Sequence, residues 1–598
     1  MMKAFSLTLG LMAVGGIAKA SVPFAIEVVD AETGRGVPLI ELRTVNEIRL
    51  VTDSAGVAAF DESGLMGRRV FFHVRGPGYA HPEDGFGFRG KAVDVVAGGR
   101  ARLAVRRLNV AQRLYRATGA GIYRDSVLVG RVPPIRAPLL NAQVLGSDSV
   151  LEAVFRGKVH WFWGDTNRPG YPLGNFQTPT ATSRLPADGG LDPDIGVDYD
   201  YAIGPEGFAA ASAPLPGEGP TWLDGLTVLA DRTGAERMFA AYAKIRPPMD
   251  AYRRGLVEFD PETRRFAEVA PIPMDAPLRP FGHPFRHVDG GVDFVYFADP
   301  YPLVRVRADV EDLRHLDRYE AFTCLLPGSR PGQPAIDRTP DGSARYAWRR
   351  GAPPLDAQEQ ARLVGSGAIR AADALFHLRD ADTGRPVVAH RGSTYRNAHR
   401  DRWVMIATEI GGQSSHLGEV WFAEADTPLG PWTYARKVVT HDRYSFYNPK
   451  QHPTFAKDGG RTLFFEGTYT ISFSGNPEPT PRYDYNQVVY KLDLADPRLK
   501  LPVPIYEVEG RFVPNAPGHR VAFYALDRPG PGTVPLGAFH ILPPETKDAP
   551  ATTTMLYRID GKGNSPAYLP EEARPTLGPV RPVGRAWKNP MGWDLPAR

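Results

Sequence analysis

This sequence has a single cysteine, no long apolar run after its first twenty residues and little excess of charge of either sign. Cys324 is the only cysteine among 598 residues, which excludes an intrachain disulfide. After the first twenty residues, no segment approaches the ~20 consecutive apolar residues that a membrane-spanning helix needs, so we expect no membrane span. The 71 basic and 67 acidic residues nearly balance and form no runs, which gives no support for a nucleic-acid or membrane partner.

The first twenty residues have the pattern of a secretory signal peptide. Lys3 supplies the charged start, residues 5–17 form a short apolar core, and Ala18-Lys19-Ala20 is an A-x-A cleavage site. We therefore predict that residues 1–20 are removed on export. Export without disulfides suits a bacterial periplasm or exterior, so we expect a secreted or periplasmic protein.

Residues 21–108 have the pattern of a small β-sandwich. Strands are expected at residues 24–29, 37–42, 48–51 and 57–60, with a hairpin turn between the last two. The segments VDAETGRGVPLIEL and TDSAGVAAF resemble the carboxypeptidase regulatory-like family, whose fold is of the transthyretin type. The resemblance implies an accessory module, and no catalytic set of residues stands out in it.

One pattern recurs about five times between residues 148 and 493: a short strand, a turn with Gly or Asp, and an apolar strand that ends on a charged residue. The 62 glycines and 58 prolines fit such a chain of short strands and turns. All-strand repeats are typical of β-propellers, whose blades have roughly 40–50 residues. We therefore predict an all-β protein with a five-bladed β-propeller over residues 139–500, an N-terminal β-sandwich, and a small C-terminal β extension over residues 501–598.

Two segments at the borders of the predicted propeller also have an expected structural role. Residues 110–138 are expected to connect the sandwich to the first blade. Residues 485–494 have an apolar pattern that is expected to form the closing outer strand.

Polar residues occur at corresponding places in the repeats. The start of the first strand and the end of the second strand of a blade share one rim, so residues at these places are expected to converge on the propeller axis. The residues so placed are Asp148 with Asp165, His283 with Asp299, and His452 with Glu466, joined by Asp224 and Glu409. Several carboxylates around one pocket are what glycoside hydrolysis requires.

The segment SDSVLEAVFRGKVHWFWGDT resembles the opening blade of the five-bladed glycoside hydrolases of families 43 and 32, and GEVWFAEADTPLGPW resembles an outer-strand segment of family 43. WFWGDT is also similar to the opening of bacterial propellers that degrade arabinan-type polymers. The resemblance implies that Asp148 is the base or nucleophile. The family has a second Asp on blade three and a general-acid Glu on blade four, but this sequence has His283 and Arg391 near those places, so the family's acid is not carried over.

Another residue must therefore donate the proton to the leaving oxygen. Glu466 is flanked by Phe464 and Phe465, and an apolar setting raises the pKa of a carboxyl, so we predict that Glu466 is the acid. Asp165 and Glu409 are reserves for these roles, and Asp224 is expected to orient the base or bind a hydroxyl. The alternative for each is a turn or strand-end carboxylate that caps backbone amides.

The residues predicted to bind substrate are His283, Asp299, His452, Asn448, Trp163 and Arg396. Each His precedes Pro at the same place in its repeat, which suits binding of a sugar hydroxyl or, alternatively, a bond to a neighbouring blade's backbone. Trp163 could stack on a sugar, but Trp161 and Trp163 share one strand face, which also suits the core. Arg168, Arg396 and Lys450 would make part of the pocket basic and favour an anionic group on the substrate.

The function predicted from the sequence is an exported glycoside hydrolase that cleaves a polysaccharide or oligosaccharide by acid/base catalysis with two carboxylates at the propeller axis. Two alternatives stay open: a non-catalytic carbohydrate-binding propeller, and a polysaccharide lyase that uses His452, Tyr447 and Arg396. The expected partner is a carbohydrate substrate. Close ligand spacing is missing, so no catalytic metal and no cofactor are predicted; a structural calcium ion at the axis would be compatible with the fold.

Overall fold

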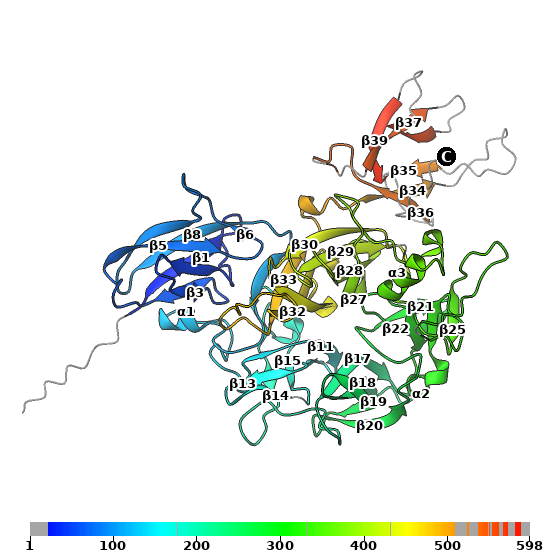
Figure 1. Ribbon diagram of the computed structural model, residues 1–598, viewed down its shortest axis with the longest axis horizontal. Helices are drawn as coiled ribbons and strands as arrows, with labels where there is room; N and C mark the ends of the chain where they lie inside the picture. The colour runs from blue at the N-terminus through cyan, green and yellow to red at the C-terminus, as the bar shows by residue number, and fades with distance from the viewer. Residues whose placement is uncertain are drawn as a thin grey trace, which may run out of the picture.

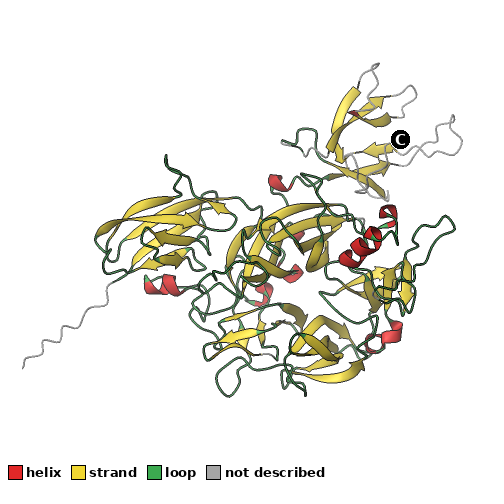
Figure 2. Ribbon diagram, in the orientation of Figure 1, coloured by secondary structure: helices red, strands yellow, loops and turns green. Residues whose placement is uncertain are grey.

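The computed structural model describes residues 22–175, 177–330, 332–430 and 432–508, and beyond these the stretches 523–525, 536–547, 549, 553–560, 566–571 and 580–587. The predicted signal peptide lies outside the described residues and stays a prediction. Strands dominate the fold, and the α-helices are few and short (Figure 2). No helix within the described part of the chain is long and apolar enough to cross a membrane. The predicted all-β class is confirmed.

Two four-stranded sheets make up the N-terminal sandwich. The first has the order β4-β1-β8-β6 and the second the order β3-β2-β5-β7. Alternate side chains of the two sheets, such as Ile26, Leu42 and Phe72, meet in one buried apolar core. The strands are β1 (Phe24–Asp30), β2 (Glu41–Thr44), β3 (Arg49–Val51), β4 (Val57–Phe60), β5 (Arg68–Arg75), β6 (Tyr79–Ala80), β7 (Gly90–Val95) and β8 (Arg100–Arg107). The likeness to the carboxypeptidase regulatory-like family stays a prediction.

Five further sheets, which we call blades I to V, are arranged in a ring (Figure 1). Blade I comprises β11 (Leu151–Phe155), β12 (Lys158–Phe162), β15 (Thr180–Ser183) and β16 (Asp200–Tyr201). Blade II comprises β17 (Thr221–Ala230), β18 (Glu236–Arg246), β19 (Asp250–Asp260) and β20 (Arg265–Ile272). Blade III comprises β21 (Phe285–Asp289), β22 (Val292–Phe297), β23 (Val304–Arg307), β24 (Glu320–Thr323) and β25 (Ala347–Arg350). This is the predicted five-bladed propeller.

Blade IV comprises β27 (Ala389–Asn397), β28 (Arg402–Glu409), β29 (Glu419–Ala425), β30 (Tyr434–Thr440) and, parallel to β30, β26 (Arg379–Asp380). Blade V comprises β31 (Ser445–Gln451), β32 (Thr462–Thr470), β33 (Asn486–Asp493) and β9 (Gln112–Arg116). The strands β10 (Gly146–Ser147), β13 (Thr166–Arg168) and β14 (Tyr171–Asn175) form a small separate sheet. In the chain, β10 precedes the first strand of blade I, and β13 and β14 lie between its second and third strands. The α-helices are α1 (Arg124–Leu128), α2 (Val310–Arg314) and α3 (Ala357–Gly365).

The described stretches of the C-terminal extension form two three-stranded sheets, as its predicted β character requires. Their orders are β35-β34-β36 and β38-β37-β39. The strands are β34 (Val503–Val508), β35 (Phe523–Ala525), β36 (Leu536–Ile541), β37 (Thr553–Asp560), β38 (Pro566–Pro570) and β39 (Val580–Trp587).

The ring is closed by a strand that comes before blade I in the sequence. β9 pairs antiparallel with β33, so β33 is the third strand of blade V and β9 is the outermost one. The assignment of residues 110–138 as a plain connection and of residues 485–494 as the closing outer strand is therefore wrong. All five residues of β9 are buried, and Leu114 packs into the core between blades I and V. Pairing of chain segments from the two ends of the propeller holds the ring together.

A buried ion cluster joins blade I to blade V beside the axis. The Glu152 carboxylate on β11 accepts hydrogen bonds from Lys450 Nζ at 3.0 Å and from His452 Nδ1 at 3.1 Å, and all three side chains are almost fully buried. Burial raises the pKa of Glu152, but Lys450 and His452 outweigh burial and bring the pKa down to about 2. We call these three residues the closure cluster.

The sandwich is attached to blade V by buried hydrogen bonds. Arg113 on β9 donates to Pro38 O at 3.1 Å in the sandwich and to the Tyr490 hydroxyl at 3.0 Å in blade V. The Tyr483 hydroxyl donates to Thr52 O at 2.8 Å. Since these groups are buried, breaking the contact would leave polar atoms without partners.

The closure cluster generates the first prediction. Glu152→Gln leaves Lys450 buried without its anion and leaves His452 with Glu466 as its remaining carboxylate, so we expect the free energy of unfolding to fall by about 3–5 kcal/mol. The ion-pair contribution depends on pH: because the pKa of Glu152 falls from 4.5 to about 2 on folding, the contribution is complete above pH 4.5 and is lost as the pH falls towards 2. Urea unfolding followed by tryptophan fluorescence measures both effects.

Glu206→Gln is the matched control, because Glu206 is exposed and its ion pair with Arg168 lies at the surface. We expect a change within about 1 kcal/mol for this variant. Equal unfolding midpoints for Glu152→Gln and wild type would show that the closure cluster does not stabilise the ring.

Candidate active site

The candidate active site lies where the innermost strands of the blades begin. These strands contact one another around the ring, as β27 does with β31 and β11 with β17. Their first residues, with the ends of the second strands, therefore converge near the axis. The polar and aromatic residues found there are Asp148, Asp165, Trp222, Asp224, Asp299, Arg391, Tyr447, Asn448 and Tyr485, which we call the axial site.

Asp148 precedes β11 and has the most perturbed carboxyl of the axial site. Its Oδ2 accepts a hydrogen bond from the Tyr447 hydroxyl at 2.8 Å. Burial and then the charge of Asp165 raise the pKa of Asp148 to about 7, although hydrogen bonds from Tyr447 and Tyr485 lower it in part. Gly164 is needed here, because a Cβ at that position would collide with Asp148 Oδ1.

Asp165 follows β12 and forms a pair with Asp148. The Asp148 amide donates to Asp165 O at 3.2 Å, which holds the two residues side by side at the open end of the β11–β12 hairpin. Asp165 Oδ1 accepts a hydrogen bond from Trp222 Nε1 at 3.2 Å. Burial raises the pKa of Asp165, and the Trp222 hydrogen bond opposes the rise. The prediction that Asp148 and Asp165 share a rim is confirmed.

A second carboxyl pair comes from blades II and III. Asp224 on β17 accepts a hydrogen bond from Gly282 N at 2.6 Å. Asp299, which follows β22, accepts from Arg391 Nη1 at 2.6 Å and from Gly392 N at 3.2 Å. Burial raises the pKa of Asp299, Arg391 lowers it and Asp224 raises it, which together leave it at about 6. Arg391 thus places a cation where the resemblance to family 43 expects the acid.

Asn448 also reaches this region. Its side chain donates to Ser149 Oγ at 2.7 Å, next to Asp148 in the sequence, and it has a positive φ of 50° at a bulge in β31. Asn448 therefore lies near the carboxyl pair, as the sequence predicted.

Glu466 does not belong to the axial site, so its assignment as the general acid is wrong. Its side chain is only 1% exposed, and its nearest charged partner is His452, with Nε2 at 3.4 Å from Oε1. Residues alternate in direction along a strand, so Glu466 shares a face with Phe464, which packs in the core between blades I and V. An apolar setting was correctly expected, but it is the interior of the propeller.

Glu409 and Arg396 are also away from the axial site. Glu409 is buried inside blade IV, where its carboxylate accepts from Arg385 Nη2 at 2.9 Å and from Trp421 Nε1 at 3.0 Å. Arg396 lies at the far end of β27, about 16 Å along the strand from Arg391, and pairs with Asp401. Neither residue fills the predicted role, because strand direction and strand face place each one elsewhere.

Trp163 is a core residue, contrary to its prediction as a substrate platform. It stacks with Trp161 at 6.4 Å between ring centroids and has edge contacts with Tyr199 at 5.1 Å. The tryptophan that does reach the axial site is Trp222, which the sequence analysis did not predict as a site residue. Trp222 lies two residues before Asp224 and therefore on the same face of β17, and this spacing could have predicted its place in the site.

The two histidines are buried beside the axis. His452 belongs to the closure cluster, so its predicted contact with substrate does not hold. His283 has its amide bonded to Ala298 O at 2.8 Å, and burial, followed by the charge of Lys450, lowers the pKa of its imidazole well below 6.5. Its Nδ1 has no hydrogen-bond partner within the described part of the chain.

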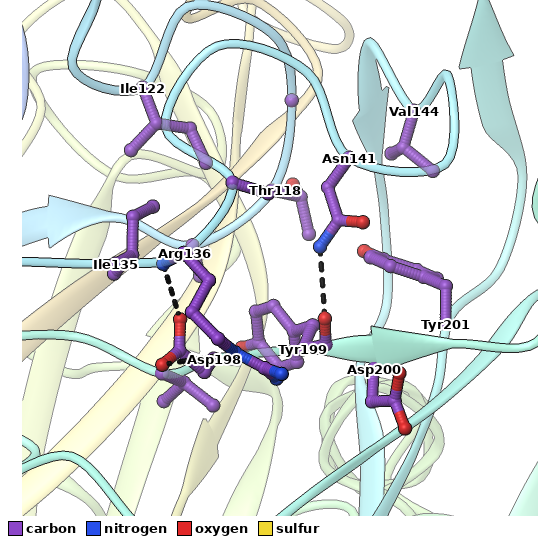
Figure 3. A pocket seen from close by; sticks show the side chains of 14 residues that line it. Thr118, Ile122, Ile135, Arg136, Asn141, Val144, Asp198, Tyr199, Asp200 and Tyr201 are labelled. Atoms are coloured by element: carbon purple, nitrogen blue, oxygen red, sulfur yellow. Dashed lines mark hydrogen bonds and ion pairs between the residues drawn. The ribbon is translucent and has the colours of Figure 1, made fainter.

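Besides the axial site, a cluster of metal ligands or a surface pocket could provide a binding site. Within the described residues, no group of three or more His, Cys, Asp or Glu side chains could hold a metal ion, and a structural calcium ion stays a prediction. A surface pocket of about 200 Å³ lies between residues 117–144 and 197–201 (Figure 3). There Asp198 is bonded to Arg136 N at 2.8 Å, and Asn141 donates to Tyr199 O at 2.9 Å. Asp198 also pairs with Arg136 Nε at 3.4 Å, so the charge of this carboxylate is already balanced.

Comparisons with known proteins find no matching family model and no matching curated protein. Solved structures with some similarity include an exo-1,5-α-L-arabinanase from a bovine ruminal metagenomic library, with 9% identity over 59% of this chain and 94% of that one and a TM-score of 0.29. A putative exo-β-1,3-galactanase from Bifidobacterium bifidum has 10% identity over 64% and 94%, with a TM-score of 0.29. A GH43_1 enzyme from Xanthomonas citri with bound xylose has 12% identity over 59% and 88%, with a TM-score of 0.30. At these values we draw no conclusion about function from the resemblance.

Proposed function

We propose that the protein is a glycoside hydrolase in which Asp148 is the general acid and Asp165 is the ionised partner that attacks the sugar or activates water. The observation that carries the proposal is the Asp148–Asp165 pair at the axis. Cleavage of an acetal needs one protonated and one ionised carboxyl, and a pair whose environments separate the two pKa values supplies both.

The surroundings of the pair assign the two roles. Asp148 has a pKa of about 7, so it carries a proton over much of the range below neutral pH. Tyr447 and Tyr485 both hydrogen-bond the Asp148 carboxyl, which holds it in a fixed position for proton donation. Asp165 accepts the Trp222 N–H, and a hydrogen bond to the charged form favours ionisation. The resemblance implies the opposite role for Asp148, but its raised pKa supports proton donation.

The rest of the axial site suits a sugar. Asp224 and Asp299 can accept hydrogen bonds from ring hydroxyls, and the half-exposed Arg391 can donate to them. Trp222 is half-buried beside Asp165, where its face can contact a sugar ring. The predicted lyase set of His452, Tyr447 and Arg396 is not assembled, since only Tyr447 is at the site. We further propose export of the enzyme, on the basis of residues 1–20.

Asparagine substitutions in the carboxyl pair test the proposal. Asp148→Asn and Asp165→Asn should each lower the hydrolysis rate by a factor of about 10²–10⁴, the usual contribution of a positioned acid or base. The measurement is release of reducing ends from soluble arabinan, galactan, xylan and inulin. Asp188→Asn, at an exposed turn of blade I, is the control and should leave the rate unchanged. Binding without any release by wild type would favour the non-catalytic carbohydrate-binding alternative.

The pH dependence tests which carboxyl donates the proton. Because Asp148 must be protonated, kcat/KM should fall as the pH rises through about 7. The Tyr447 hydrogen bond lowers the pKa of Asp148, so Tyr447→Phe should move this alkaline limb to higher pH. Tyr252→Phe, which removes a hydroxyl bonded to Glu218 O in blade II, should leave the limb in place. A downward shift in Tyr447→Phe would contradict the assignment of Asp148 as acid.

A further inference from the structure

Phe473 is a large aromatic side chain that is exposed next to the axial site. It lies in the loop between β32 and β33, and 65% of the residue is accessible to solvent. Its ring contacts the Tyr447 ring edge to face, with 5.7 Å between centroids and an interplanar angle of 79°. Tyr447 in turn bonds the Asp148 carboxyl. One side chain therefore separates Phe473 from the proposed general acid.

The backbone holds Phe473 in a costly conformation. Its φ of 64° lies in the left-handed region, which a bulky residue seldom adopts and which costs about 1–3 kcal/mol. The loop around it is fixed by hydrogen bonds from Ile471 N to Asp484 Oδ1 at 2.7 Å and from Ser474 Oγ to Ile471 O at 2.6 Å. The strained φ and the exposure of the apolar ring both oppose stability, and backbone strain of this kind clusters at active sites and ligand-binding sites.

Trp222 provides a second aromatic group on the other side of the carboxyl pair. It comes from blade II and bonds Asp165, whereas Phe473 comes from blade V and reaches Asp148 through Tyr447. Blade I, which carries both carboxyls, lies between blades II and V in the ring (Figure 1). An aromatic side chain therefore flanks each member of the pair.

We propose that Phe473 is a sugar-binding platform that stacks on the leaving-group sugar of an oligosaccharide, while Trp222 contacts the sugar on the opposite side of the scissile bond. The inference rests on the proposed function, because it takes the Asp148–Asp165 pair as the point of cleavage. The general acid protonates the leaving oxygen, so the sugar beside Asp148 is the leaving group. Stacking on that sugar gives the enzyme a preference for chains over single glycosides.

The charges of the site favour a neutral chain. Asp148, Asp165, Asp224 and Asp299 lie at the axial site, where Arg391 pairs with Asp299 and Arg279 adds a second positive charge near it. The cations that suggested an anionic substrate are engaged elsewhere: Lys450 with Glu152, Arg168 with Glu206, and Arg396 with Asp401. A uronate would add negative charge to this group of carboxyls, which raises the cost of binding it.

Binding is measured first, in the Asp148→Asn background so that the probe is not consumed. The probes are soluble arabinan, galactan, xylan and inulin, tested by retardation in native affinity gels. Adding Phe473→Ala should weaken retention by about tenfold, which corresponds to loss of one ring-stacking contact. Adding Phe473→Tyr should restore retention, because the ring face remains. Phe86→Ala removes a ring that is 89% exposed in the sandwich and should change nothing.

Hydrolysis by the Phe473→Ala single variant then tests the platform independently of the proposed hydrolase activity. Phe473→Ala in the otherwise intact enzyme should raise KM for the polymer while kcat changes little. Unchanged retention and unchanged KM in Phe473→Ala would overturn the platform while leaving the hydrolase intact. Retention that depends on Phe473 without hydrolysis by wild type would support the platform and refute the hydrolase. Failure of wild type to be retained by any of the four polysaccharides would overturn the inference.

Discussion

Ring closure is the constraint on which the rest of this structure depends. A propeller brings the starts of its inner strands together only if its first and last blades are held against each other. Two interactions do this here: the pairing of β9 with β33, and the closure cluster in which Glu152 of blade I meets Lys450 and His452 of blade V. The axial site exists because these contacts bring Asp148 of blade I against Tyr447 of blade V.

The same physical cause, removal from water, gives Glu152 and Asp148 opposite properties. Burial alone would raise the pKa of both carboxyls. Glu152 meets two cationic partners, so its pKa falls to about 2 and it serves as a fixed anion. Asp148 has no cationic partner among the described residues, so burial, with a further contribution from the charge of Asp165, raises its pKa to about 7 and it can hold a proton. A structural and a chemical role are thus separated by the sign of the neighbouring charge, within five residues of one blade.

Sequence periodicity predicted the fold well and the site in part. The repeated strand pattern was enough for five blades, and the strand-end positions of Asp148 and Asp165 were enough to place them on one rim. β9 was missed because Gln-Arg-Leu-Tyr-Arg has no apolar alternation, although all of it is buried. Glu466 and Trp163 were misplaced because rim position alone does not say which strand face a side chain takes, and a blade buries both faces. That face is set by packing against neighbouring blades.

The replacement of the expected blade-four acid by Arg391 has a consequence for how the site is built. In the proposed mechanism the acid and its partner are both on blade I, so their separation is set by one hairpin, β11–β12, through its backbone hydrogen bonds. It does not depend on how tightly two blades pack against each other. Small shifts between blades would then alter how Trp222, Asp299 or Arg391 meet a substrate without changing the distance between the reacting carboxyls. In the proposed mechanism blade I therefore carries both reacting carboxyls, while Tyr447 of blade V and Trp222 of blade II adjust their pKa values.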